Sequence, residues 1–409
     1  ILSLIVQKYG GTSVSDVKKI KHVSRRIIER LEQGHSIVVV VSAMGDTTDK
    51  LLALAQSISD SPNPRETDVL LSTGEIVASS LIALTLSEMG FEAISLSGSQ
   101  AGIVTDNLHG NAMIAKVNAG RILKELDSEK IVIVAGFQGV GDDTDVRLLG
   151  RGASDLSAVA IAAELQAERC EIFTDVEGIY TADPRIVADA KKISEIGYEE
   201  MLEMASSGAK MQPRSIELGM TFGVPILVAS TFNNNPGTLI HGGAKIMNPI
   251  VGEIRNRVTG VPSEKNVSKI TILGAIDQPG VAAEIFEPLS KAGISVDVIV
   301  QNTSNSGTTD ITFTVKSAQL KEALEITQIS SSNLKINGVS AEDGFGKVSI
   351  IGTGMLNVPG YASKMFNALA KASVNIEMIT TSEIRITCLV KETQLDQAVR
   401  AVHSAFDVG

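Results

Sequence analysis

Residues 4–14, LIVQKYGGTSV, join an apolar run to a lysine, two glycines and two hydroxyl residues. The apolar run predicts a buried strand that ends at Lys8, and Gly10 and Gly11 predict a turn directly after it. Two interpretations fit this pattern. Either an anion lies against the side-chain-free backbone and Lys8 neutralises it, or the segment is an ordinary strand-to-helix turn with a solvated lysine. This stretch alone does not separate the two.

The composition is that of a soluble globular protein with room for two or three domains: 409 residues, 44% hydrophobic and 20% charged. A net charge of −11 argues against a surface devoted to nucleic acid, but it leaves room for a local phosphate pocket. Apolar runs such as Ile37–Val41 are too short for a membrane helix, and residues 1–7 lack a signal-peptide pattern. Two distant cysteines, Cys170 and Cys388, and five scattered histidines predict a reduced, cytoplasmic setting without a zinc site.

Short apolar runs alternate with helix-period segments up to about residue 240. Because the Val and Ile runs are continuous, the strands are expected to be buried on both faces, in a largely parallel sheet covered by helices. The predicted strands are Ser3–Lys8, Ser36–Ser42, Glu92–Leu96, Lys130–Ala135, Glu171–Thr174 and Pro225–Ala229. The predicted helices include Val17–Gln33, Ile76–Met89, Met113–Leu126 and Asp155–Ala167.

Glycines gather where these strands end, at Gly10–Gly11, Gly45, Gly98, Gly136–Gly139 and Gly178. In parallel α/β sheets, ligands bind beyond the carboxyl ends of the strands. The opening turn therefore lies in the expected ligand crevice, which favours the anion-binding interpretation.

A repeat fills the C-terminal part of the chain. Residues 274–286, GAIDQPGVAAEIF, match 354–366, GMLNVPGYASKMF, and 291–299, KAGISVDVI, match 371–379, KASVNIEMI, both at an offset of 80 residues. Each copy predicts a strand, a Pro-Gly turn, a helix, two strands, a helix and a strand. Turn-rich residues 233–243 precede the repeat. We therefore expect a first domain over 1–245, a linker and first module over 246–345, and a second module over 346–409.

Four further segments carry polar groups that suit a phosphate or carboxylate. Residues 148–165 place Arg151 between two glycines before a helix whose first turn holds Ser154 and Asp155; anion binding or simple N-capping would explain this. Residues 173–185, FTDVEGIYTADPR, either supply aromatic, acidic and basic groups that could bind a nucleotide or form only a turn. Residues 42–49, SAMGDTTD, and 72–75, STGE, each end a strand or open a helix. Glu75 is either functional or an acid stabilised by the helix dipole.

Together the motifs at 8–14, 42–49, 72–75, 150–155 and 174–185 resemble those of aspartate kinases (aspartokinases), and the repeat is similar to the paired ACT regulatory domains of that family. The resemblance extends over essentially the whole chain. It implies an α/β fold: an N-terminal amino-acid-kinase-type three-layer sandwich with a mainly parallel sheet, plus two C-terminal βαββαβ ACT modules. The implied reaction uses ATP with Mg²⁺ to phosphorylate the side-chain carboxylate of L-aspartate to 4-phospho-L-aspartate, the first step toward lysine, threonine and methionine.

The resemblance also implies roles for individual residues. Lys8, Arg151 and Asp155 would serve catalysis by charge neutralisation and alignment, and no general base is needed because the attacking carboxylate is already ionised at neutral pH. Arg151 would bind a carboxylate of aspartate, and Glu75 would bind the ammonium group of aspartate. The residues implied for aspartate are Ser42, Thr47, Glu75, Arg151 and Ser154. The residues implied for ATP are Lys8, Tyr9, Gly10, Gly11, Ser13, Thr174, Asp175, Tyr180, Asp183, Arg185 and Lys210.

The chain departs from the family pattern at two places. Ala153 stands where a second glycine is usual, which is tolerable unless that position needs a positive φ angle. The stretch from Lys210 to Arg214 is one residue shorter than usual, which leaves open where the Lys210 side chain points.

In ACT modules the Pro-Gly turn is implied to bind the carboxylate of an amino acid, while a nearby acid takes the ammonium group. Because Asp277 corresponds to Asn357 in the second copy, we expect unequal sites: threonine bound through Asp277 and Gln301 across an ACT–ACT interface, and lysine as a second regulator. Two structural modules that only dimerise are the alternative. The implied regulatory residues are Asp277, Gln278, Pro279, Gly280, Val281, Ala282, Ser295, Val296, Asp297, Gln301, Asn302, Tyr361, Ala362, Asn375, Ile376, Ser382 and Glu383.

The expected partners are L-aspartate, ATP, the amino-acid regulators and further copies of the chain joined through ACT domains, without nucleic acid or membrane. Met247 could start a separately translated C-terminal subunit, as in some relatives. Two rival functions stay open: another enzyme of the amino-acid-kinase fold, such as a glutamate or carbamate kinase, and a non-catalytic amino-acid sensor.

Overall fold

The computed structural model describes residues 3–243, 258–301, 307–332, 334, 336–355 and 359–408. Contacts within the chain divide it into two compact units. Unit 1 comprises the described parts of 1–179, 192–206 and 210–249, and unit 2 those of 180–191, 207–209 and 250–409. The expected boundary at residue 245, together with Met247, lies outside the described residues.

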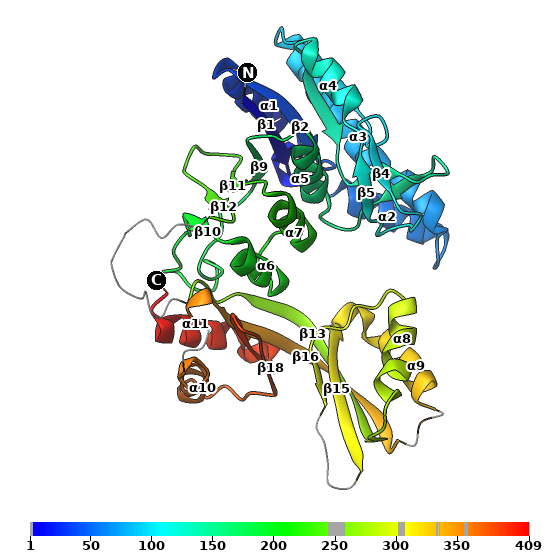
Figure 1. Cartoon of the computed structure of the whole chain (residues 1–409), viewed down its shortest axis with the longest axis vertical. Coiled ribbons are helices and arrows are strands. Elements are labelled where there is room, and N and C mark those ends of the chain that lie inside the picture. The colour runs from blue at the N-terminus through cyan, green and yellow to red at the C-terminus, as the bar shows by residue number, and fades with distance from the viewer. Residues whose placement is uncertain are drawn as a thin grey trace. The chain divides into compact units, whose positions relative to one another are not determined.

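In unit 1 the described residues form an eight-stranded sheet in the order β10-β12-β11-β9-β1-β2-β6-β3 (Figure 1). All neighbouring strands in it are parallel except β11 and β12. The strands are β1 (Ser3–Tyr9), β2 (His35–Val41), β3 (Ala93–Leu96), β6 (Ile131–Ala135), β9 (Arg169–Thr174), β10 (Glu195–Ile196), β11 (Ile226–Ser230) and β12 (Thr238–Ile240).

Helices cover both faces of this sheet. The helices α1 (Val17–Glu32) and α3 (Pro64–Glu88) pack on one face, whereas α5 (Ser154–Glu164) packs against β1, β2 and β9. Along β1, Ile5 and Tyr9 enter the core beneath α1 and α3, while Lys8 points to the α5 side. The predicted three-layer arrangement and mainly parallel sheet are therefore confirmed. The other helices of unit 1 are α2 (Thr47–Ile58), α4 (Gly120–Asp127), α6 (Tyr198–Ser206) and α7 (Pro213–Phe222).

The six predicted strands lie within one or two residues of the observed ones, but two predicted helices are partly wrong. Residues 114–117 form strand β5, because they pair with β4 (Ile103–Thr105), and α4 begins only at Gly120. Helix α3 begins at Pro64, twelve residues before the predicted start, after Asn63 caps the amides of Arg65 and Glu66. The 72–75 stretch thus lies inside a helix rather than at its opening.

A second, four-stranded sheet in the described part of unit 1 has the order β5-β4-β7-β8. Its strands are β4, β5 (Ile114–Val117), β7 (Gln138–Val140) and β8 (Val146–Leu148). Strand β8 contacts α3, and it leads directly into the Gly150–Gly152 turn that opens α5. This sheet therefore supports the turn that carries Arg151.

Among the described residues, α3 alone has the length and apolar composition of a membrane-crossing helix. Half of the most apolar 18-residue stretch of α3 is buried inside unit 1, where Ala78, Ile82 and Leu86 belong to the core. This burial is that of a core helix in a globular domain.

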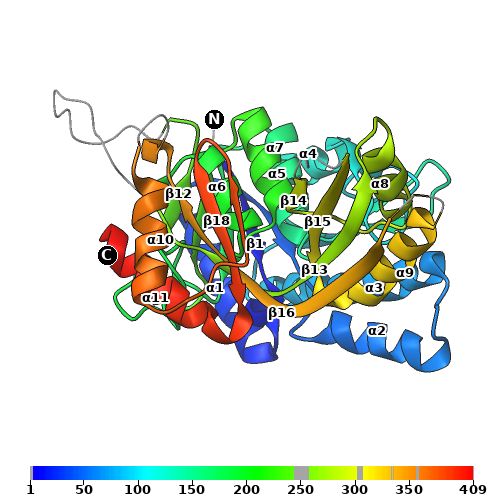
Figure 2. The ribbon, with the colours of Figure 1, turned by 90° about the horizontal axis from the view of Figure 1, so that it is seen from below.

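In unit 2 the described residues form a six-stranded sheet in the order β14-β15-β13-β16-β18-β17. The long strands β13 (Ser263–Ile276) and β16 (Gly338–Ile351) pair antiparallel and span both modules, from α10 and α11 at one end to α8 and α9 at the other (Figures 1 and 2). The other elements are α8 (Val281–Lys291), β14 (Ile299–Gln301), β15 (Thr308–Lys316), α9 (Leu320–Ser331), α10 (Tyr361–Lys371), β17 (Met378–Thr381), β18 (Arg385–Lys391) and α11 (Leu395–Phe406).

The two ACT modules exchange strands through β13 and β16. The predicted fold class is confirmed, but the strand expected after the last helix of the second copy is supplied by the beginning of β13, where Ser263 faces Val348 and Val267 faces Phe345. The expected boundary at residue 345 falls inside β16. The modules therefore share one continuous sheet, without a linker at that point.

Residues 180–191 pack with the second module. Ala182 and Val187 belong to its core together with Val261, and the Val261 amide donates a 2.6 Å hydrogen bond to the Thr181 carbonyl. The Thr181 hydroxyl lies 3.1 Å from Nε2 of buried His403. This segment of the predicted nucleotide loop is thus part of unit 2.

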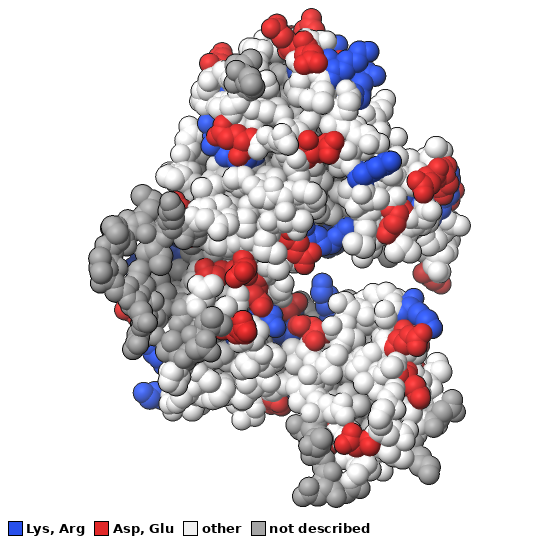
Figure 3. Space-filling view, viewed as in Figure 1, with Lys and Arg blue, Asp and Glu red and all other residues white. Residues whose placement is uncertain are grey.

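Charged side chains of both signs are interspersed over the face seen in Figure 3. Among the described residues of that face, no broad basic area is present. This distribution agrees with the net charge of −11.

Candidate active site

A buried ion pair marks the carboxyl edge of the main sheet. Lys8, near the end of β1, places Nζ 2.6 Å from Oδ1 of Asp155 in the first turn of α5, and the two side chains are 11% and 12% exposed. Neither Ser154 nor Asp155 caps α5 through its side chain. The capping alternative for this helix start therefore fails, and Asp155 instead holds a lysine at the position where ligands bind in such sheets.

The glycines after β1 have specific packing roles. The Gly10 amide donates to the Phe173 carbonyl at 3.2 Å. A Cβ atom at Gly11 would lie 2.6 Å from the carbonyl oxygen of Ala43, so that position excludes any side chain. At Gly11 the close approach of residues 43–45 already requires a glycine, and room for a phosphate at Gly10 and Gly11 stays a prediction.

Two of the other predicted ATP residues beside β1 point into the protein. The Tyr9 ring is fully buried, stacks on Phe173 at 5.0 Å, and donates its hydroxyl to Gln7, so only the main chain of Tyr9 can meet a ligand. Burial raises the pKa of the Tyr9 phenol well above its usual value. The hydroxyl of buried Ser13 lies 2.6 Å from that of Thr231.

Glu75 is a buried carboxylate with one unused oxygen. Its Oε1 accepts a 3.0 Å hydrogen bond from the Ala43 amide, while buried Oε2 has no hydrogen-bond partner among the described residues. Burial raises the pKa of Glu75 to about 7. Gly74 allows this placement, since a Cβ there would lie 2.8 Å from that of Ala43. A buried oxygen without a partner is costly, which suits a site where a ligand cation completes the pairing.

Arg151 stands on a turn that only glycines make without strain. Gly150 and Gly152 have φ angles of 94° and 78°, in the left-handed region, and Ala153 has a φ of −77°. The expectation that alanine is tolerable at residue 153 is therefore confirmed. The Arg151 side chain is 85% exposed and pairs with Asp49 at 2.5 Å, so it can exchange this partner for a ligand carboxylate.

The hydroxyl residues predicted for aspartate surround the same edge. The Ser42 amide follows β2 and donates to the Tyr9 carbonyl at 3.1 Å. The Thr47 hydroxyl, at the start of α2, donates to the Met44 carbonyl at 2.6 Å and retains only acceptor capacity. Ser154 is buried beside Gly136, where a Cβ would lie 3.0 Å from its own.

The predicted nucleotide residues divide between the two units. Thr174 ends β9 and donates its hydroxyl to Asp175 at 3.1 Å, and Lys210 is exposed in the turn before α7; these three belong to unit 1. Tyr180, Asp183 and Arg185 belong to unit 2. There the Arg185 guanidinium pairs with the Asp183 carboxylate at 2.6 Å.

A cavity of about 580 Å³ in unit 1 lies away from the Lys8–Asp155 pair. It opens on the opposite face of the sheet, where Gln7 rather than Lys8 points. Its arginines are already engaged: Arg30 and Arg169 pair with fully buried Glu171 at 3.1 and 2.7 Å, and Arg26 donates to carbonyls of 230–233. We therefore assign the candidate active site to the Lys8 side.

In the second module, four predicted regulatory residues line one cavity of about 240 Å³ beside the Gly360 turn. Gly360 has a φ of 108° and precedes the first residue of α10. Asn357, expected to differ from Asp277, lies outside the described residues. The four residues are Tyr361, Ala362, Ser382 and Glu383.

In the first module, the predicted residues lie on an open surface. Asp277, Gln278, Pro279, Gly280 and Ala282 are exposed, Val281 is buried beneath them at the start of α8, and Ser295 is exposed while Val296 is partly buried. Gln301 lies on edge strand β14, whereas Asn375 and Ile376 precede the opposite edge strand β17. Within one copy of the chain, these groups therefore lie at opposite edges of the sheet. Asn302 lies outside the described residues.

Sequence reasoning missed the partner of Asp297. The ammonium group of Lys347, on β16, pairs with the Asp297 carboxylate and lies 3.1 Å from that of Glu264. The Lys347 side chain is only 8% exposed. A lysine in the middle of a strand shared by both modules gives no local signal of this contact.

Residues 3–230 match the model of the amino acid kinase family. Residues 270–328 and 348–406 match the model of the ACT domain. Fold and site thus define an amino-acid-kinase-type enzyme domain joined to paired ACT domains. The aspartokinases of Mycolicibacterium smegmatis and Corynebacterium glutamicum are each 46% identical over 412 residues, covering 100% of this chain and 97% of theirs. The chain belongs to the aspartokinase family.

Solved structures agree with this assignment. Escherichia coli aspartokinase III in complex with aspartate and ADP matches with a TM-score of 0.83 at 26% identity, over 98% of this chain and 99% of that one. The same enzyme in complex with lysine and aspartate matches with a TM-score of 0.74 at 25% identity, over 98% and 99%.

Proposed function

We propose that the carboxyl edge of the unit 1 sheet is where this aspartate kinase brings ATP and L-aspartate together. The reaction is ATP-dependent phosphorylation of the aspartate side chain. A side-chain carboxylate oxygen of aspartate attacks the γ-phosphorus, the bond to the β-phosphate oxygen breaks, and 4-phospho-L-aspartate and ADP form. Since the carboxylate is ionised at neutral pH, no proton transfer is needed. The observation that carries this placement is the buried Lys8–Asp155 pair at 2.6 Å.

Within this site, Lys8 holds the transferring phosphoryl group and Asp155 holds Lys8. Arg151 leaves Asp49 to take a carboxylate of aspartate, as an arginine fork suits such a group. Glu75 takes the substrate ammonium with Oε2, which has no hydrogen-bond partner among the described residues. Ser42, Thr47 and Ser154 supply further contacts. Because two anions must meet, positive charge and alignment account for most of the catalysis.

The nucleotide residues that we propose beyond Lys8 follow from the family resemblance. They are Tyr9, Gly10, Gly11, Ser13, Thr174, Asp175, Tyr180, Asp183, Arg185 and Lys210. At Tyr9 and Gly10 the available groups are main-chain ones, and the Gly10 amide is already engaged with Phe173. Thr174 ends β9, the strand beside β1, and Asp175 directly follows it.

Mg²⁺ is proposed to accompany ATP. Among the residues that the structure describes, no three His, Cys, Asp or Glu side chains converge to hold a metal ion. Mg²⁺ does not need such a cluster, because it keeps several waters and is usually held by substrate phosphates with only one or two carboxylates. When bound to ATP, it neutralises charge on the phosphates.

A hydroxamate assay tests the function directly. With ATP and Mg²⁺, we expect turnover with L-aspartate and at least about 100-fold less with L-glutamate, because a longer side chain misplaces the attacking oxygen. Preferred turnover of glutamate would favour the rival kinase. Absence of turnover with either amino acid, in a folded preparation, would favour the sensor.

For regulation, we propose that threonine, with or without lysine, binds the ACT modules and lowers activity. Two features support this: the cavity of about 240 Å³ in the second module, and residues 180–191, which pack in the core of that module. An effector that shifts the module acts directly on the segment that carries Tyr180, Asp183 and Arg185. Because Gln301 and Asn375 occur at opposite edges of the sheet, we propose a homo-oligomer in which two copies complete one effector site.

Filling this cavity should weaken regulation without affecting turnover. Ala362→Trp puts an indole into the cavity of about 240 Å³, where Tyr361, Ala362 and Ser382 are proposed to bind lysine. The added inhibition by lysine in the presence of threonine is therefore expected to weaken about 10-fold or more, the cost of losing a packed ligand contact. The matched control is Ser363→Trp, one residue along α10, exposed and outside the cavity. Equal inhibition of both variants would remove this cavity from the regulatory mechanism.

A cytoplasmic location and a separately made C-terminal subunit starting at Met247 also remain proposals. The first is supported by Cys170 and Cys388, which are both buried and unbonded, as in a reducing compartment. N-terminal sequencing of the protein from its native cells would reveal a second chain beginning at Met247.

A further inference from the structure

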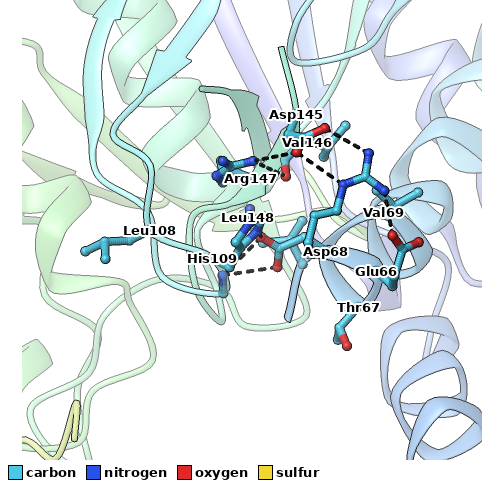
Figure 4. A network of polar contacts seen from close by, with 12 residues as sticks. Glu66, Thr67, Asp68, Val69, Leu108, His109, Asp145, Val146, Arg147 and Leu148 are labelled. Carbon is cyan, nitrogen blue, oxygen red and sulfur yellow. Dashed lines mark hydrogen bonds and ion pairs between the residues drawn. The ribbon is translucent and has the colours of Figure 1, made fainter. Parts of the chain in front are cut away.

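Two charged side chains, the buried Asp68 and the partly buried Arg214, hold the loop 109–112 and the residues at the end of β8. Asp68 lies in α3 and is 1% exposed. As Figure 4 shows, its carboxylate faces His109 and Leu148; it accepts from the Gly110 amide at 3.1 Å and the Leu148 amide at 3.3 Å, and lies 2.8 Å from His109 Nδ1. Several donors on one carboxylate fix the loop against β8.

Arg214 lies in the first turn of α7. Its guanidinium donates to the Leu149 carbonyl at 2.8 Å and to the Ala112 carbonyl at 2.9 Å, and lies 3.4 Å from Asn111 Oδ1. These contacts join the loop to the residue directly before Gly150. A planar guanidinium can donate to both carbonyls at once, which an ammonium group cannot do in the same geometry.

The turn that carries Arg151 is held on both sides by this part of α7. Gln212, the N-cap of α7, places Nε2 3.4 Å from the Arg151 carbonyl, while Arg214 holds Leu149. A Cβ at Gly150 would lie 2.5 Å from Asn111 Oδ1, so the turn fits closely against the same loop. The backbone on each side of Gly150 is therefore tied to one helix start.

We propose that Arg214 is a positioning residue for aspartate: it sets the backbone of the Gly150–Gly152 turn so that Arg151 meets the substrate carboxylate. The inference rests on the proposed role of Arg151 in binding aspartate. Arg214 itself donates to main-chain carbonyls, and we expect no direct contact between it and ATP. Its loss should therefore affect aspartate and spare ATP.

The test is Arg214→Met, measured by steady-state kinetics with aspartate and ATP varied separately. We expect the KM for aspartate to rise about 10-fold or more, within the roughly 100-fold that a 1 Å displacement can cost, while the KM for ATP changes less than 2-fold. In an Arg151→Ala background, Arg214→Met should not raise the KM for aspartate further, because both substitutions remove the same contact, that of Arg151 with the substrate carboxylate. Arg214→Lys keeps the positive charge but loses the planar guanidinium, and should give an intermediate KM for aspartate.

The matched control is Arg65→Met. Arg65 is exposed and pairs with Asp145 and Glu66, and among the described residues it has no hydrogen bond or ion pair with the Gly150–Gly152 turn. It should leave both KM values unchanged. Additive effects of Arg151→Ala and Arg214→Met, or equal rises in both KM values, would overturn the inference; if Arg214→Met does not fold, Arg214→Lys decides by the same criteria. If Arg151→Ala leaves the KM for aspartate unchanged, the proposed function of Arg151 fails instead.

Discussion

Lys8→Ala should lower kcat by more than about 100-fold, the scale of losing one preorganised charge contact to a transition state. Two negative partners approach each other in this reaction, and Lys8 is the buried cation at the end of β1. Its removal also leaves the Asp155 carboxylate, 12% exposed, without its partner and repelling the phosphates. Turnover in the hydroxamate assay at saturating ATP and aspartate measures the effect.

The control is Lys18→Ala, an exposed lysine near the start of α1, which should remain within about 2-fold of the parent. Because Lys8→Ala breaks a buried pair, its unfolding temperature must be recorded beside the kinetics. Lys8→Ala/Asp155→Ala removes the stranded carboxylate and should recover stability but not turnover. Near-normal kcat in folded Lys8→Ala would eliminate Lys8 from the mechanism.

Glu75→Gln should raise the KM for aspartate by about 10-fold or more at pH 8, since a hydrogen bond to a charged group contributes about 1.5–3 kcal/mol. In the free enzyme the pKa of Glu75 is raised to about 7 by burial, and only the ionised form pairs with an ammonium group. The KM of the parent should therefore fall as pH rises through about 7, and Glu75→Gln should flatten this profile. The control, Glu88→Gln at the exposed end of α3, should retain it.

The same pKa has a consequence for stability. Because the folded pKa of Glu75 exceeds its value of 4.5 in the unfolded chain, the unfolded state ionises first as pH rises. The contribution of protonated Glu75 is complete below about pH 4.5 and is lost as pH rises to about 7. Without aspartate, the free energy of unfolding of Glu75→Gln, measured with denaturant, should exceed that of the parent at pH 8. Near pH 4.5 the two values should be similar. A parent with no such pH dependence would contradict the burial of an unpaired carboxylate.

Several features of this fold could be predicted from sequence because they depend on local pattern. The continuous Val and Ile runs identify strands buried on both faces, and the repeat at an offset of 80 residues identifies two related modules. Predictions failed where a distant partner decides the local structure. Residues 114–117 have a helical period but pair with β4, and the 72–75 stretch was expected to open a helix that begins at Pro64.

The candidate site divides in the same way. The sequence alone determined that Lys8 ends a buried strand, that Arg151 stands between glycines, and that Glu75 and Asp155 occur in helical segments, because residue type and spacing decide these facts. Only the tertiary structure decided that Lys8 pairs with Asp155, that one oxygen of Glu75 is buried without a hydrogen-bond partner, and that β13 completes the second module. Such contacts join residues far apart in the chain, so their geometry depends on strand register and packing, which no local pattern specifies.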